Sequence, residues 1–379
     1  MDNCFQGVYV QIPFCLKKCF YCAFPSYDGK EEHIQDYVDA LSNEIANALC
    51  SCPPETVYFG GGTPSILTVK QMEKAVSSLK KNGWWTVMQE RTFEANPGAV
   101  DMEKMQAFKE LGFNRISIGA QTFSGAILEK VGRVHTGVQA VEAIQNASQA
   151  GFVNINVDLM YGLPGQDLID LKTNIDLAIK LGATHVSVYG LVVEEGTPLE
   201  RMLAEKILEL PGDTLDEEMY DLIVSYLPRK GFDRYEISNY ASKNFQSRHN
   251  TIYWRYESYR GFGTAACTFD GKERITNTEC VEDYIEAFKM HRDVPSQTEE
   301  IDEQTAMAEF VFMGLRMANG ISPDDFKARF GKDINDVYAQ PLAENVKKGW
   351  LEMGFRIKLT PAGMKVANKI FLTFLPLTS

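Results

Sequence analysis

The sequence predicts an α/β protein with a parallel sheet covered by helices, followed by a smaller α+β domain. A glycine that ends a helix and is followed by an apolar strand recurs along the chain, and polar residues follow successive strands. This rhythm stops near residue 232, where the composition becomes aromatic and irregular. We therefore expect two domains, covering residues 1–232 and 233–379.

The repeated unit is a helix, a glycine and a strand. The pairs Leu111-Gly112, Ala150-Gly151 and Leu181-Gly182 each precede an apolar, strand-like run, and their glycines are 39 and 31 residues apart. Glycine suits the left-handed end of a helix, and each spacing suits one βα unit. Further strands are expected at 7–13, 56–59 and 91–95, and a helix over 34–49.

These strands give six βα units, fewer than the eight of a complete barrel. Periodicity alone leaves two arrangements open: a barrel with an opening along one side, or a doubly wound sheet.

The C-terminal domain becomes regular again from about residue 305. Apolar residues recur at helical spacing there, and Ser322-Pro323 is typical of a helix start. A hairpin is expected over 351–359 and a final helix over 364–373. Helices followed by a hairpin predict a winged-helix-like module at about 305–379. Such modules often bind DNA, but the acidic charge of the chain favours a structural or docking role.

Composition narrows the class of protein. The 379 residues are 45% hydrophobic and 23% charged, as in ordinary globular proteins. The net charge of -13 disfavours nucleic acid as a partner. We find no export signal and no apolar run long enough to span a membrane. A transient association with a membrane stays possible. Eight cysteines then favour a cytoplasmic location, with thiols rather than disulfides.

Three of these cysteines, Cys15, Cys19 and Cys22, lie within eight residues. Three thiolates at this spacing can hold a [4Fe-4S] cluster and leave one iron without a protein ligand. The alternatives are a structural zinc site or a disulfide framework. Zinc usually requires a second short-spaced pair of Cys or His residues, and His33, Cys50 and Cys52 do not form one.

Polar residues stand where four consecutive predicted strands end. Gly61, Gly62 and Thr63 follow the second strand, Glu94 the third, Gln121 the fourth and Asp158 the fifth. Each has an ordinary explanation by itself, such as a glycine turn or a helix cap. Because βα barrels bind ligands at this end of their strands, the coincidence predicts a site there.

With this cysteine loop and the Gly60-Gly-Gly-Thr-Pro64 turn, the chain resembles the radical S-adenosylmethionine (SAM) superfamily. The resemblance implies a partial (β/α)6 TIM-like barrel and decides between the two arrangements. It also implies a [4Fe-4S] cluster on the three cysteines, with SAM on the open iron and Tyr21 near the adenine. The family's SAM contacts fall on Tyr9, Tyr21, Gly61, Gly62, Thr63, Glu94, Gln121, Arg133 and Asp158, among which Arg133 would pair with the SAM carboxylate.

A closer resemblance is to the branch that contains oxygen-independent coproporphyrinogen III oxidase and the haem chaperone HemW. Ile12-Pro-Phe-Cys15, the segment 158–166 and the C-terminal module carry it. Phe24 stands where the oxidase has a further cysteine, and only 14 residues precede Cys15, where the oxidase has an N-terminal extension. One departure is Gln11, where relatives usually have histidine.

The segment 249–254 matches the HNxxYW motif of HemW, which implies a haem site at His249, Asn250, Tyr253 and Trp254. Without the resemblance, His249 would be interpreted as structural, as His135 and His185 are. An imidazole can nevertheless ligate haem iron, and aromatic side chains can pack on a porphyrin.

Two functions follow from this resemblance. The preferred one is a haem chaperone that binds haem as cargo and delivers it to an acceptor, such as a respiratory protein. The other is an oxidase of porphyrin biosynthesis, in which a radical derived from SAM abstracts hydrogen from propionate side chains. Whether the chain is an enzyme stays open, and a winged-helix regulator is a third interpretation that the acidic charge disfavours.

Overall fold

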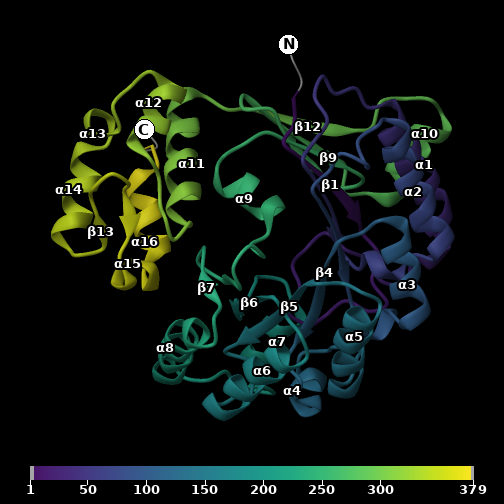
Figure 1. Cartoon of the computed structure of the whole chain (residues 1–379), viewed down its shortest axis with the longest axis horizontal. Coiled ribbons are helices and arrows are strands. Elements are labelled where there is room, and N and C mark those ends of the chain that lie inside the picture. Colours follow the sequence, from purple (N-terminus) through teal and green to yellow (C-terminus); the bar gives the residue numbers. More distant parts are fainter. Residues whose placement is uncertain (1–3, 377–379) are drawn as a thin grey trace.

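The computed structural model describes residues 4–376 and confirms the predicted parallel sheet (Figure 1). Its central strands pair in chain order, each parallel to the next. They are β1 (Gly7–Ile12), β2 (Thr56–Gly61), β3 (Glu90–Ala95), β4 (Arg115–Gln121), β5 (Asn154–Tyr161) and β6 (His185–Gly190).

Helices follow these strands and cover one face of the sheet. They are α1 (Ile34–Asn47), α2 (Val69–Lys81), α3 (Met102–Leu111), α4 (Gly125–Lys130), α5 (Gly137–Gln149), α6 (Leu168–Lys180), α7 (Pro198–Ala204) and α8 (Asp213–Arg229). Short 3₁₀ turns occur at Glu31–His33, Pro64–Ile66 and Pro97–Ala99. The predicted helix over 34–49 ends two residues early, and Leu49 is 89% exposed, so its place in the apolar face was wrong.

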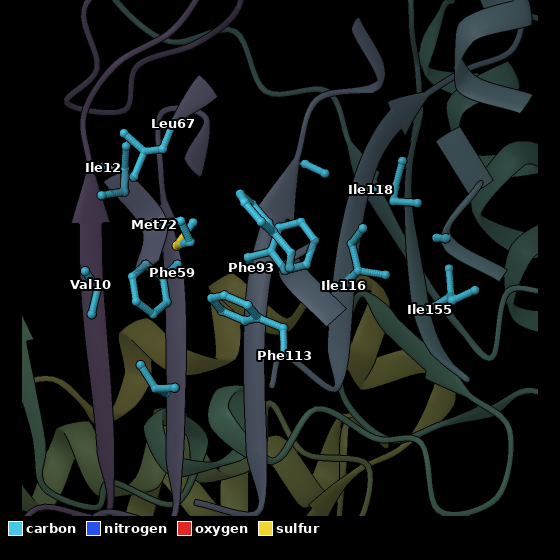
Figure 2. Packing of buried hydrophobic residues seen from close by; sticks show 14 of the residues in the cluster. Val10, Ile12, Phe59, Leu67, Met72, Phe93, Phe113, Ile116, Ile118 and Ile155 are labelled. Carbon is cyan, nitrogen blue, oxygen red and sulfur yellow. The ribbon is translucent and has the colours of Figure 1, made fainter. Parts of the chain in front are cut away.

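The main hydrophobic core lies between the sheet and these helices. Phe59, Phe93 and Ile116 point from neighbouring strands into this layer, together with Met72 of α2 (Figure 2). Because alternate side chains of a strand face opposite ways, the other half of each strand is left to line the interior of the barrel.

The three glycines of the repeat end helices as predicted. Gly112, Gly151 and Gly182 have φ angles of 109°, 88° and 104°, in the left-handed region where a side chain is disfavoured. Each therefore turns the chain from its helix into the next strand.

The sheet continues beyond residue 232. Its order is β12-β11-β10-β9-β1-β2-β3-β4-β5-β6-β8-β7, so later strands extend both edges. These strands are β7 (Asp233–Arg234), β8 (Asn239–Ala241), β9 (Tyr259–Phe262), β10 (Cys267–Phe269), β11 (Glu273–Asn277) and β12 (Ser296–Glu300). β9 pairs parallel with β1, and β8 pairs antiparallel with β6. The domain boundary at residue 232 stays a prediction.

Helix α9 (Arg248–Trp254) lies at the N-terminal ends of the barrel strands. The carboxylate of Glu90 accepts hydrogen bonds from the backbone N–H groups of Arg248 and His249 at 3.1 and 3.0 Å. Thr56 Oγ1, at the start of β2, is 2.8 Å from Nδ1 of His249. These contacts fix α9 as the floor of the barrel.

The C-terminal module has its own hydrophobic core, which includes Phe310, Phe326 and Ile370. Its elements, with the preceding α10, are α10 (Val281–Lys289), α11 (Glu303–Leu315), α12 (Pro323–Phe330), α13 (Ile334–Val337), α14 (Ala339–Lys347), β13 (Leu351–Glu352), β14 (Lys358–Leu359), α15 (Pro361–Lys365), α16 (Ala367–Phe371) and a 3₁₀ turn (Leu372–Phe374). Ser322 caps α12 and β13 pairs with β14, as predicted. The single final helix was wrong, because Val366 (φ -120°) separates α15 from α16.

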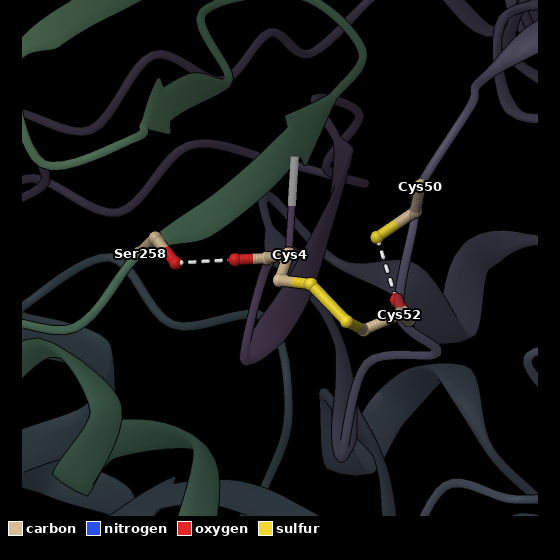
Figure 3. The surroundings of a disulfide bond; sticks show 4 residues. All are labelled: Cys4, Cys50, Cys52 and Ser258. Carbon is tan, nitrogen blue, oxygen red and sulfur yellow. Dashed lines mark hydrogen bonds between the residues drawn. A yellow bond between two sulfur atoms is a disulfide. The ribbon is translucent and has the colours of Figure 1, made fainter. Parts of the chain in front are cut away.

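Cys4 and Cys52 form a disulfide, which corrects the expectation that the cysteines would all be thiols. The residues also pair as an isolated β-bridge, which brings their side chains together although 48 residues separate them in sequence. Cys50 donates a hydrogen bond to the Cys52 carbonyl, and Ser258 donates one to the Cys4 carbonyl (Figure 3). Within residues 4–376, no helix is long and apolar enough to cross a membrane.

We predict that Phe93→Ala destabilises the protein by about 3–5 kcal/mol, because it removes a buried ring that packs on Phe108, Phe113 and Phe152. Thermal unfolding followed by circular dichroism measures the change. Phe355→Ala is the matched control, since that ring is 86% exposed. Equal unfolding temperatures for the two variants would contradict the packing described above.

Candidate functional site

The cysteine loop begins directly after β1 and is fastened at several points. Tyr27 N–H donates to the Pro13 carbonyl and Cys15 N–H to the Tyr27 carbonyl, at 2.7 and 2.8 Å. Gln11 Nε2 donates to the Pro25 carbonyl at 3.1 Å, while Gln11 Oε1 accepts from the Tyr9 hydroxyl at 2.8 Å. Gln11, noted as a departure from relatives, therefore ties the loop to the barrel interior.

The three thiols of this loop line one cavity. Thr63 Oγ1 donates to Cys15 Sγ at 3.6 Å, and Arg133 Nη1 donates to Cys19 Sγ at 3.4 Å. Burial raises the pKa of Cys15, so a positive neighbour or a bound metal has to stabilise its thiolate. Thr63 and Arg133 are hydrogen-bond donors of the kind that stabilise a thiolate.

The structure offers no ready-made site for a single metal ion among the described residues. In the part of the chain that the structure describes, no group of three His, Cys, Asp or Glu side chains is placed around one metal position. A zinc ion needs its ligands on one centre, whereas a [4Fe-4S] cluster takes each cysteine on a separate iron. Three free thiols on one loop are the donors that such a cluster takes, and the assignment of the cluster to these cysteines stays a prediction.

The cavity has a volume of about 730 Å³ and runs along the inside of the barrel. Its upper wall, at the C-terminal ends of the strands, contains Cys15, Cys19, Cys22, Tyr21, Gly61, Gly62, Thr63, Glu94, Gln121, Arg133 and Asp158. The structure therefore brings together the predicted cluster ligands and all but one of the predicted SAM contacts. Tyr9 does not line the cavity, but its ring stacks on that of Tyr58, which does.

The glycine turn after β2 has no room for side chains at Gly61 and Gly62. Gly61 has φ +107°, and a Cβ there would collide with the side chain of Gln11. At Gly62 a Cβ would lie 2.6 Å from the Phe14 carbonyl oxygen. The packing of the turn against Gln11 and Phe14 therefore requires glycine at both positions. Gly61→Val would strain the strand itself, so it separates binding from folding poorly.

Two acids face the cavity in different surroundings. Burial raises the pKa of Glu94 to about 7, and its Oε1 accepts a hydrogen bond from the Tyr58 hydroxyl at 2.8 Å. Asp158 accepts from Ser117 Oγ at 2.9 Å and from Asn156 Nδ2 at 2.8 Å. Glu94 is therefore the acid whose charge changes near neutral pH.

Two further predicted residues are held by the end of β4. Gln121 has φ 64°, which is unusual for a residue with a side chain, and it lies where the pairing of β4 with β5 shifts register. Arg133 donates to the Gly119 carbonyl as well as to Cys19. The irregular backbone thus presents Gln121 and Arg133 to the cavity beside the cysteine loop.

The predicted haem residues lie at the opposite end of the barrel. His249 is 1% exposed, and its two ring nitrogens are hydrogen-bonded to Thr56 and to the Tyr253 hydroxyl, both at 2.8 Å. Burial, and secondly the charge of Arg115, lowers the pKa of His249 to about 3, so the ring is neutral. Asn250 lines the cavity, whereas Trp254 packs under the guanidinium of Arg316 at 4.4 Å.

The sequence analysis missed further polar residues of the cavity, which are Arg115, Ser117, Asn156, Ser187 and Tyr189. By strand register, Arg115 and Asn156 lie nearer the strand starts than Glu94 and Asp158, Ser117 and Ser187 lie level with these acids, and Tyr189 lies nearer the strand ends. The signal was present in β4, where polar and small residues alternate with isoleucines in Arg115-Ile-Ser-Ile-Gly119. Alternation of this kind marks the inward face of a strand.

Comparison with known proteins agrees with this geometry. The family model of the Radical SAM superfamily matches residues 9–178, and that of the HemN C-terminal domain matches residues 301–366. The solved structure of coproporphyrinogen III oxidase (HemN) from Escherichia coli superposes with a TM-score of 0.82 at 20% identity, covering 98% of this chain and 90% of that one. The barrel and its cysteine-lined cavity are those of a radical SAM protein.

The curated relatives are more specific. The chain is 34% identical to the heme chaperone HemW of Bacillus subtilis, covering 98% of this chain and 99% of that protein. It is 32% identical to HemW of Escherichia coli, covering 97% and 98%. The chain belongs to the HemW family.

We predict that Cys15→Ser, Cys19→Ser or Cys22→Ser each prevents assembly of the cluster, because three thiolates supply its protein ligands. Anaerobic reconstitution followed by absorption spectroscopy measures the iron–sulfur content. Cys267→Ser on β10 and Cys52→Ser in the disulfide are controls that should retain it. A cluster that survives in Cys19→Ser but not in Cys267→Ser would refute the assignment.

We predict that Glu94 makes the SAM-free protein less stable as the pH rises. Its pKa is raised from 4.5 to about 7 on folding, so folding favours the protonated form, and the stability it contributes is lost between these pH values. The free energy of unfolding of Glu94→Gln should therefore rise by on the order of 3 kcal/mol relative to that of wild type across this interval. Thermal unfolding at several pH values measures it. Glu73→Gln on the exposed side of α2 is the control, and parallel profiles for wild type and Glu94→Gln would contradict the prediction.

Proposed function

We propose that this chain is a haem chaperone that binds haem and transfers it to an acceptor protein. The observation that carries the proposal is the similarity to HemW proteins over nearly the whole length of both chains. Fold similarity to the oxidase cannot choose between the two functions, because both share the barrel and the cavity.

Phe24 supports the chaperone over the oxidase. It stands where the oxidase branch has a further cysteine, and its side chain is 71% exposed at the mouth of the cavity. An exposed aromatic ring can contact a flat apolar ligand but cannot replace a thiol in chemistry. The missing thiol therefore favours the chaperone over the oxidase.

In this proposal a [4Fe-4S] cluster is held by Cys15, Cys19 and Cys22, and SAM binds at the open iron. Bound SAM would fill the cluster's free coordination position. Arg133 would hold the SAM carboxylate, Glu94 and Asp158 would accept hydrogen bonds from its amino and ribose groups, and the glycine turn would allow close approach. The cluster requires reduced thiols at these positions, which favours the cytoplasm as the location.

Haem would bind near the floor of the barrel, in the region of His249, Asn250, Tyr253 and Trp254. His249 can ligate iron only after giving up one of its two hydrogen bonds. Its Nε2 is the nitrogen to release, because its partner Tyr253 lies on α9 itself, whereas Nδ1 fastens α9 to Thr56 of β2. The acceptor would be a haem protein, such as a respiratory one. This chain would associate with a membrane at most transiently when it delivers haem.

We predict that the reconstituted protein retains added haem and converts little or no coproporphyrinogen III. Two anaerobic reactions measure this: haem binding by its Soret absorption, and conversion of coproporphyrinogen III with SAM and a reductant. Rapid formation of decarboxylated product would show that the chain functions as the oxidase and not as the chaperone. Absence of both activities would contradict the proposal as well.

We predict that His249→Ala weakens haem binding at least about tenfold, because it removes the axial ligand. Tyr253→Phe keeps the ring but frees Nε2 of His249, so it should bind haem at least as tightly as wild type. Haem titration and thermal unfolding are measured in parallel. Unchanged affinity in a folded His249→Ala protein would show that this imidazole only fastens α9 to β2.

A further inference from the structure

Arg115 is a fully buried cation inside the barrel. It is the first residue of β4, its side chain lines the cavity, and the residue is 1% exposed. Among the described residues, its Nε and Nη1 have no hydrogen-bond partner. A guanidinium keeps its charge at any physiological pH, so an uncompensated one at this depth costs several kcal/mol.

The acids around Arg115 are engaged elsewhere. Glu90 accepts from the backbone of α9, and Asp158 accepts from Ser117 and Asn156. No described carboxylate lies within ion-pairing distance of Arg115. Burial disfavours the Arg115 cation, whereas the nearby charges of Glu90 and Asp158 favour it and hold its pKa above the usual value, yet neither acid contacts the guanidinium.

The other cations that line the cavity differ from Arg115 in this respect. Arg133 donates to the Gly119 carbonyl and to Cys19, and Lys18 Nζ donates to the Phe24 carbonyl at 2.9 Å. Lys17 is exposed and lies over the ring of Phe20 at 5.5 Å. Arg133 Nε also lacks a partner, but both Nη atoms of Arg133 are bonded, whereas Arg115 is 1% exposed and leaves both Nε and Nη1 without one.

We propose that Arg115 binds a carboxylate of the cargo, a propionate of haem, at the floor of the barrel. The inference rests on the proposed function and adds the group that recognises haem as a dicarboxylate. A guanidinium presents a fork of N–H donors that matches a carboxylate, and burial strengthens the pair. Arg115 is also close enough to lower the pKa of His249, so both predicted haem contacts lie at the same end of the barrel.

The test compares haem with its dimethyl ester, which has the same ring and iron but no free carboxylate. Reconstituted protein with its cluster is titrated with each form. Wild type should bind haem about 10- to 100-fold more tightly than the ester, as expected for a charge-assisted hydrogen-bonded pair. In Arg115→Met this ratio should fall to near one.

Two further variants separate recognition from folding. Arg91→Met is the matched control: it lies on the neighbouring strand and donates to the Trp85 carbonyl, outside the cavity, so it should keep the wild-type ratio. Arg115→Lys keeps the charge but lacks the fork, and should give an intermediate ratio even where Arg115→Met does not fold. A wild-type ratio in both Arg115 variants would overturn the proposal and make Arg115 a structural residue.

The remaining outcomes identify which idea fails. Wild type that binds both forms equally overturns the role of Arg115 and leaves the chaperone function standing. Wild type that binds neither overturns the proposed function together with this inference. A loss of SAM affinity in Arg115→Met, with the haem ratio unchanged, would assign Arg115 to the SAM carboxylate instead and overturn the proposal.

Discussion

The fastening of α9 beneath the barrel is the interaction on which the rest of the structure depends. The strands β1 to β6 do not close on themselves, so their inward polar side chains need a cover. Glu90 and Thr56, at the starts of two strands, supply it by holding the backbone and the imidazole of α9. Without this floor, Arg115 and Asn156 would face water, and the cavity would be a channel. The low dielectric that sharpens its electrostatics comes from this closure.

Closure gives the cavity two unlike ends. At the C-terminal ends of the strands, glycines, an acid with a shifted pKa and three thiols surround space in which a cofactor fits. At the other end lie the neutral imidazole of His249 and the guanidinium of Arg115, each on a residue that is 1% exposed. A cofactor at one end and cargo at the other would communicate through the polar residues between them, notably Ser117, Asn156 and Asp158, which form one hydrogen-bonded chain.

Local patterns were enough to predict much of the fold and of the upper site. Helix-ending glycines act through their own φ angles, so Gly112, Gly151 and Gly182 could be recognised without knowing their neighbours. Parallel strands bring their ends to one edge, so Glu94 and Asp158 could be expected to meet. The pairing of Cys4 with Cys52, the hydrogen bonds of His249 and the depth of Arg115 could not. They depend on which distant segments become adjacent, as when β9 takes its place beside β1, and no local pattern records that.

The position of β1 has a consequence for how the protein matures. The strand is flanked by β2 and by β9, so Gly7 pairs with both Thr56 and Tyr259. The cysteine loop that follows β1 also contacts segments from late in the sequence. The Tyr27 hydroxyl donates to the Glu279 carbonyl, and Lys30 pairs with Glu282. During synthesis the N-terminal strand must therefore wait for some 250 residues before its second neighbour exists. If the loop holds a cluster, we expect loading to be a late event that a nascent chain halted before β9 would not support.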